Sequence, residues 1–127
     1  MPAPSTDPTL PDPRPQLIDD DGPARLAGLR CTACGYPAAT AVPWCPRCQA
    51  AVEPALFGPA GRVWSSTVVR VPLPGRTPPY TLAYVDLVDG PRVLVHLPGE
   101  AGPAAVGTAV SLVRVPDVSD VCAAVTR

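Results

Sequence analysis

Four of the five cysteines in this chain form two closely spaced pairs, and this pattern constrains the fold more than any other feature. Cys31 and Cys34 make one Cys-x-x-Cys knuckle, Cys45 and Cys48 make a second, and ten residues separate the two. A tetrahedral Zn²⁺ takes four soft ligands at about 2.3 Å, and each knuckle presents two sulfur atoms to one point while leaving backbone amides free to stabilise thiolates. The spacing therefore predicts a closed metal site with zinc as the expected ion.

Disulfides, unliganded buried thiols and an iron site are the alternatives. The N-terminus lacks the basic start and apolar run of a secretion signal, so we expect a reducing, cytoplasmic compartment in which thiols stay free. Iron is the sharper alternative, because residues 31–36, CTACGY, look like a rubredoxin knuckle. The gap between the knuckles is shorter than rubredoxin leads us to expect. We therefore favour zinc in a structural role.

Composition indicates one small domain and a metal-stapled module. The chain has 127 residues, of which 46% are apolar and 17% charged, and its 20 prolines and 10 glycines exclude a mainly helical fold. No apolar run approaches the roughly 18 residues of a membrane-spanning helix, so we expect no membrane partner. The net charge of -1 gives a poor electrostatic footprint for nucleic acid, even though every basic residue is Arg.

The chain divides into three predicted segments. Residues 1–24 contain seven prolines and mostly acidic charges, which favours an extended or disordered arm; the alternative is a segment that drapes over a partner. Residues 25–53 form the predicted zinc ribbon. Residues 54–127 form the predicted barrel, with strands at residues 62–71, 80–88, 92–97, 108–115 and 121–125 and a loop at 72–79. Asp89 and Gly90 are a tight-hairpin signal. The fold class is therefore mainly β, a four-cysteine zinc ribbon followed by a five-stranded OB-fold barrel.

The order of these motifs resembles a known family. Residues 25–35, 45–48, 61–69 and 78–90 are similar to the acyl-CoA-associated OB-fold family with an N-terminal rubredoxin-like zinc ribbon, long catalogued as a domain of unknown function. The resemblance covers about residues 25–127. The N-terminal arm departs from it, because relatives often have a helix there, and residues 120–125 match no pattern of the family.

The resemblance implies a non-catalytic accessory subunit. Such proteins look like auxiliary subunits of thiolase-superfamily enzymes that make or break carbon–carbon bonds in acyl-CoA or related substrates, and the partner supplies the catalytic residues. It implies a hetero-oligomer in which this chain stabilises the thiolase-like subunit and borders its substrate channel. A CoA thioester is then expected only in the complex.

Recognition is expected in the proline-rich loop. Arg76 lies between Pro74, Gly75, Pro78 and Pro79, and loops at the mouth of a rigid barrel often carry function. We expect Arg76, Pro78, Pro79 and Tyr80 to contact the partner or a CoA phosphate.

Three further residues have structural roles as their default interpretation. His96, the only histidine, needs a positioned partner to act as a base, so we expect a structural or surface role. No basic group or histidine is evident near Cys122, which favours a small core residue over a nucleophile. Trp64 could stack on a base, but packing in the barrel core is favoured.

Asp86 lies in the middle of a predicted strand, where a carboxylate needs a partner. Arg62, Arg70 and Arg92 are candidates on neighbouring strands, so a structural ion pair is expected.

Two rival functions belong to other classes. OB folds and zinc ribbons both bind single-stranded nucleic acid, but the low charge and few aromatic residues disfavour it. A small enzyme is disfavoured because the chain has one His, no Lys and no glycine-rich phosphate loop.

Overall fold

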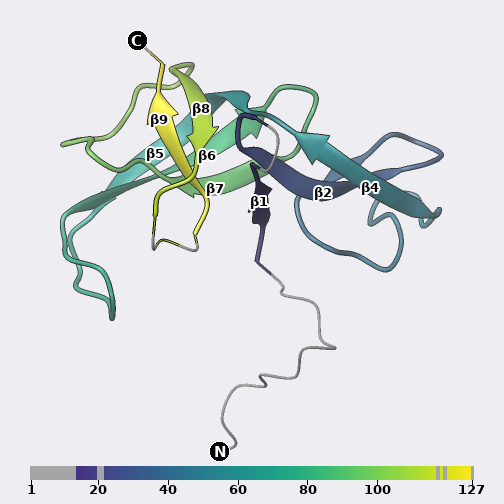
Figure 1. The fold of residues 1–127 in the computed structure, drawn as a ribbon, viewed down its shortest axis with the longest axis horizontal. Helices are drawn as coiled ribbons and strands as arrows, with labels where there is room; N and C mark the ends of the chain where they lie inside the picture. The colour runs from purple at the N-terminus through teal and green to yellow at the C-terminus, as the bar shows by residue number, and fades with distance from the viewer. Residues whose placement is uncertain (1–13, 20–21, 117, 119, 127) are drawn as a thin grey trace, which may run out of the picture.

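The computed structural model describes residues 14–19, 22–116, 118 and 120–126. Every regular element in these residues is a strand, and the strands form a small sheet followed by a closed barrel (Figure 1). The predicted fold class is confirmed: five strands close the barrel, and the four-cysteine ribbon precedes it. In the described part of the chain, no helix has the length and hydropathy to cross a membrane.

The ribbon sheet is built around its second strand. Its members are β1 (Gln16–Ile18), β2 (Arg25–Cys31), β3 (Pro37–Ala38) and β4 (Val52–Phe57). The central strand β2 pairs antiparallel with β1, β3 and β4. Cys31 at the end of β2 is opposite Val52 at the start of β4. This register places both knuckles at the same end of the sheet.

The barrel closes in the order β5-β6-β7-β9-β8. Its members are β5 (Ala60–Val69), β6 (Tyr80–Leu87), β7 (Arg92–His96), β8 (Ala109–Val113) and β9 (Cys122–Val125). Neighbours are antiparallel except β7 and β9, which are parallel where His96 pairs with Cys122. The predicted hairpin at Asp89 and Gly90 joins β6 to β7.

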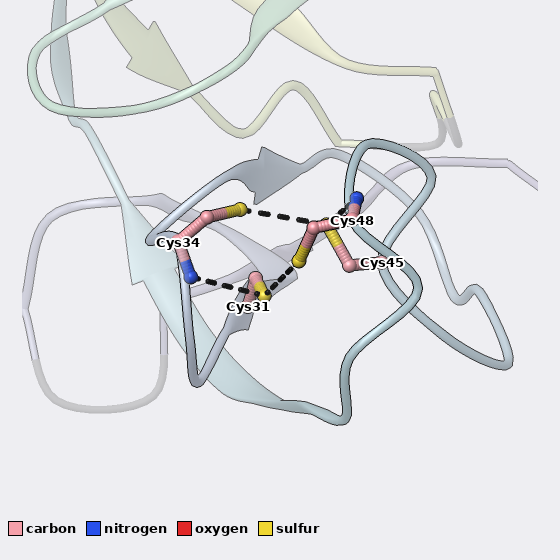
Figure 2. Close-up of side chains that lie close together, drawn as sticks. All are labelled: Cys31, Cys34, Cys45 and Cys48. Carbon is pink, nitrogen blue, oxygen red and sulfur yellow. Dashed lines mark hydrogen bonds between the residues drawn. The ribbon is translucent and has the colours of Figure 1, made fainter.

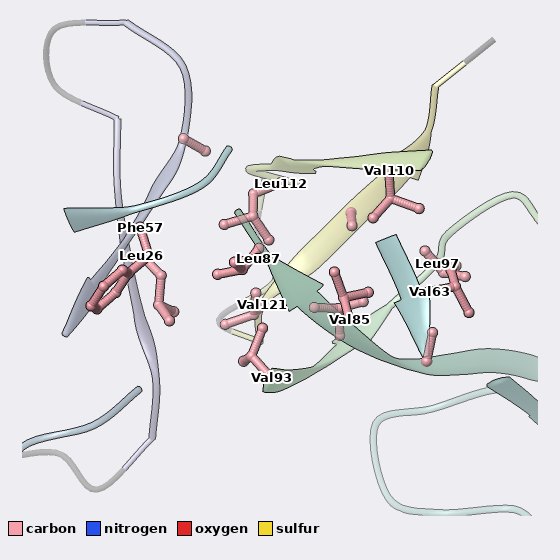
Figure 3. Packing of buried hydrophobic residues seen from close by; sticks show 14 residues of the cluster. Leu26, Phe57, Val63, Val85, Leu87, Val93, Leu97, Val110, Leu112 and Val121 are labelled. Atoms are coloured by element: carbon pink, nitrogen blue, oxygen red, sulfur yellow. The ribbon is translucent and has the colours of Figure 1, made fainter. Parts of the chain in front are cut away.

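One hydrophobic core serves both the sheet and the barrel. Residues of β6 and β7 alternate between buried and less buried positions, as a strand with one face on a core requires. Val85 and Val95 are fully buried in the barrel interior, and Leu26 and Phe57 from the ribbon sheet belong to the same cluster (Figure 3). The ribbon is therefore packed on the barrel rather than tethered to it.

Trp64 contradicts the expectation that it packs in the barrel core. Its side chain is 49% exposed, whereas the preceding Val63 is 2% exposed. The register between β5 and β6 shifts between Val63 and Ser65, so Trp64 is the extra residue of a β-bulge. Trp64 continues the alternation of β5, in which Gly61 and Val63 are buried and Arg62 is exposed, and the alternation breaks only after it.

Arginine side chains connect the ribbon to the barrel at two places. Arg30 donates to the Gly35 carbonyl oxygen at 2.9 Å and to the Asp89 carbonyl oxygen in the β6–β7 hairpin at 2.7 Å. Arg114, just after β8, donates to Asp19 at 2.9 Å and to the Leu17 carbonyl oxygen at 2.7 Å. The contacts of Arg114 attach β1, which lies in the N-terminal proline-rich segment, to the barrel.

At Gly28 the strand β2 packs closely against its neighbours in the ribbon sheet. A Cβ atom at Gly28 would clash with the Ala38 carbonyl oxygen and lie 2.9 Å from Cε2 of Phe57. We expect Gly28→Ala to lower the free energy of unfolding by about 1–3 kcal/mol, because backbone and a buried ring must both move. Gly102→Ala is the matched control, since no atom lies within 4 Å of its added Cβ. Equal denaturation midpoints for the two variants would contradict this packing.

Candidate metal centre and loop cluster

The two knuckles share one backbone geometry. In the first, the Gly35 N–H donates to the Cys31 carbonyl oxygen at 3.1 Å; in the second, the Gln49 N–H donates to the Cys45 carbonyl oxygen at 2.9 Å. Gly35 and Gln49 both have positive φ, at 77° and 67°. Glycine adopts this conformation freely, whereas Gln49 needs support from its surroundings. The sequence thus folds each Cys-x-x-Cys segment into the same tight turn.

Backbone amides point at the first sulfur of each knuckle. The N–H groups of Ala33 and Cys34 lie 3.3 and 3.4 Å from Cys31 Sγ. The N–H groups of Arg47 and Cys48 make the same contacts, at 3.3 and 3.4 Å, with Cys45 Sγ. Donors in this position stabilise a thiolate, which is the form that binds a metal ion.

The four sulfur atoms converge as a tetrahedral site requires (Figure 2). All lie within 4.8 Å of one another; Cys31 and Cys48 are 3.4 Å apart, and Cys34 and Cys45 are 3.7 Å apart. Four ligands at about 2.3 Å from a central ion would be about 3.8 Å from each other. All four are free thiols rather than disulfides. The four predicted ligands are therefore brought together, and they fit a four-coordinate ion.

Electrostatics in the cluster favour thiolates at the two buried sulfurs. The N–H of Cys34, helped by that of Ala33, lowers the pKa of Cys31 to about 6. Burial opposes ionisation of Cys45, but the N–H groups of Cys48 and Arg47 lower its pKa. At Cys48 an N–H from Ala50 also favours the thiolate, yet the neighbouring sulfurs raise its pKa to about 12. Crowding of the sulfurs therefore opposes ionisation of Cys48.

A second cluster links the proline-rich loop to the segment before β9. Arg76 forms an ion pair with Asp120, and His96 Nε2 lies 3.7 Å from Asp120 Oδ2. The loop itself is a tight turn in which the Arg76 N–H donates to the Leu73 carbonyl oxygen at 3.0 Å. Burial, followed by the charge of Arg76, lowers the pKa of His96. The imidazole is therefore neutral at neutral pH.

Three of the four predicted contact residues line one hollow. Arg76, Pro79 and Tyr80 line a hollow of about 210 Å³ together with His96, and the Arg76 guanidinium lies 6.0 Å from the centre of the Tyr80 ring. Pro78 is not part of its lining. Asp120 was not predicted, because nothing local distinguishes it as the partner of an arginine 44 residues earlier.

Cys122 has surroundings that the sequence did not reveal. It is 1% exposed, in agreement with a small core residue, and burial raises the pKa of its thiol. The expectation that no basic group or histidine is nearby is wrong. Pairing of β7 with β9 places His96 directly across from Cys122, and the charge of Arg76 acts on the thiol.

The expected ion pair of Asp86 is confirmed, and Arg92 is the partner. Arg92 donates through Nε to Oδ1 at 2.7 Å and through Nη2 to Oδ2 at 3.1 Å. These hydrogen bonds lower the pKa of Asp86. The same guanidinium lies 3.8 Å from the centre of the Trp64 ring. The pair therefore also holds an exposed aromatic side chain.

Comparison with known proteins agrees with this architecture. Residues 55–115 match the family described as ChsH2, C-terminal OB-fold domain. A solved structure named Ltp2-ChsH2(DUF35) aldolase is 29% identical, with a TM-score of 0.64 over 79% of this chain and 82% of that one. No curated protein matches. The family model and the solved structure both support the resemblance to the acyl-CoA-associated OB-fold family.

Proposed function

We propose that this chain is a non-catalytic accessory subunit of a thiolase-like enzyme that acts on acyl-CoA or a related acyl substrate. It stabilises the catalytic partner and borders its substrate channel. The observation that carries the proposal is the likeness, over most of both chains, to a chain from a structure whose name joins Ltp2 to ChsH2 and denotes an aldolase. A CoA thioester binds only in the complex, and the complex works in the cytoplasm.

The chemistry of the two reactive side chains supports an auxiliary role. Cys122 is buried with a raised pKa, so little thiolate is available for attack. His96 lies across from Cys122, but the Cys122 thiol donates to the Asp120 carbonyl oxygen rather than to the imidazole. Catalysis is accordingly assigned to the partner.

We further propose that the cysteine cluster holds one structural Zn²⁺. Four thiolates complete a tetrahedral shell and leave no position for substrate, as in structural zinc sites. Zinc neutralises the charge that otherwise keeps a proton on Cys48. Iron in the same cluster is the alternative.

Co-expression with the thiolase-like protein encoded nearest to this chain tests the function directly. We expect a stable complex that co-elutes in size-exclusion chromatography and processes an acyl-CoA substrate. The thiolase-like protein expressed alone should be less stable or less active. Separate elution of two folded proteins would contradict the proposal.

Metal analysis tests the zinc assignment. The wild-type chain is expected to carry one zinc per chain and to be colourless, because Zn²⁺ has no visible absorption. Cys45→Ser should lose the metal and the hydrogen-exchange protection of β2 and β4, since metal binding and folding of such a ribbon are one equilibrium. Cys122→Ala is the control and should keep one equivalent. Visible absorption bands and stoichiometric iron would instead identify an iron site.

Arg76 is proposed to act at the contact with the partner or with a CoA phosphate, together with Pro78, Pro79 and Tyr80. We expect Arg76→Ala to weaken complex formation or raise the KM for the acyl-CoA several-fold. Asp120→Ala separates contact from loop positioning, because it removes the ion pair and leaves the guanidinium in place. Equal losses in both variants would mean that Arg76 only positions the loop. No loss in Arg76→Ala would exclude the contact.

A further inference from the structure

The outer surface of β5, β6 and β7 carries apolar side chains where a solvated sheet would carry polar ones. Trp64, Tyr84 and Leu94 are 49%, 45% and 45% exposed. Tyr84 is directly opposite Leu94 across the β6–β7 pair and opposite Ser65 across the β5–β6 pair. An antiparallel sheet with one face on the core normally presents polar residues outward. We call Trp64, Tyr84, Leu94 and Arg92 the aromatic face.

The side chains of the aromatic face are held in place before any partner arrives. The Trp64 and Tyr84 rings meet edge to face, with centroids 6.2 Å apart and planes at 77°. Arg92 lies over the Trp64 ring at 3.8 Å and is itself fixed by the two hydrogen bonds to Asp86. Binding costs less when side chains are already ordered, because less rotamer entropy is lost.

The face also has a shape that can receive another surface. A shallow hollow of about 290 Å³ is lined by Tyr84, Leu94, Leu82 and Ala83. Ser65 and Thr67 also line it. An apolar hollow next to Trp, Tyr and Arg has the composition of an interface hot spot.

We propose that the aromatic face is where this chain docks on its thiolase-like partner, and that the hollow takes an apolar side chain of that partner. The proposal rests on the proposed function. Charge favours a protein surface as occupant, because Arg92, the cation of the aromatic face, is already paired with Asp86. A nucleic-acid groove needs cations that remain available for phosphates. An apolar protein surface instead benefits from charges that are already paired.

The test uses wild-type chain and variants with the thiolase-like protein encoded nearest to it. Leu94→Arg and Tyr84→Ala should each raise the dissociation constant of the complex at least about tenfold, as loss of a central contact does. Val106→Arg is the matched control, because Val106 is 77% exposed but lies outside the aromatic face. The dissociation constant of this variant's complex should stay within about twofold of the wild-type value. Because all three side chains are substantially exposed, melting temperatures of the isolated variants should match wild type.

Each outcome decides the question. If the wild-type chain binds and both face variants bind with the same affinity, the proposed docking surface is wrong. The proposed accessory-subunit function is unaffected by that result. Failure of the wild-type chain to bind removes the proposed function and the docking surface together. A change in the oligomeric state of the isolated chain in Leu94→Arg, without an effect on the complex, would assign the face to a second copy. Wild-type binding to a single-stranded oligonucleotide that Tyr84→Ala abolishes would assign it to nucleic acid.

Discussion

Convergence of four sulfur atoms is the constraint on which the N-terminal third of the structure depends. β1 has three residues and β3 has two, so hydrogen bonds of the sheet alone give little stability. Leu26 and Phe57 secure the barrel-side end of β2 and β4 in the shared core. At the opposite end the strands run into the knuckles, where few apolar side chains are buried. A metal ion held by the four cysteines would do there what a hydrophobic core does elsewhere.

Local patterns predicted most of the fold and the four-cysteine cluster. Each knuckle is formed by residues within five positions, and the barrel strands alternate with a period of two, so both signals lie in short windows of sequence. The Asp89–Gly90 hairpin is equally local. These are the parts in which neighbouring residues along the chain decide the conformation.

Long-range features could not be predicted in the same way. Alternation along β5 directs Val63 inward and Trp64 outward, whereas the large apolar indole by itself favours a core position. Asp120 joins Arg76 because β9 returns to the barrel beside β7, which depends on the closed topology. For Asp86 the sequence offered three arginines, and the register of β6 with β7 selects Arg92.

Arginine acts throughout this molecule as a cross-link between backbone segments. Arg30, Arg92 and Arg114 each engage two acceptors at once. A planar guanidinium with five donors can span two acceptors, which an ammonium group does less well. Arg30 has a particular consequence, because its two acceptors are a carbonyl of the first knuckle and a carbonyl 59 residues away at the end of β6. A misfolded first knuckle would therefore displace Arg30 and remove a hydrogen bond from the turn that joins β6 to β7.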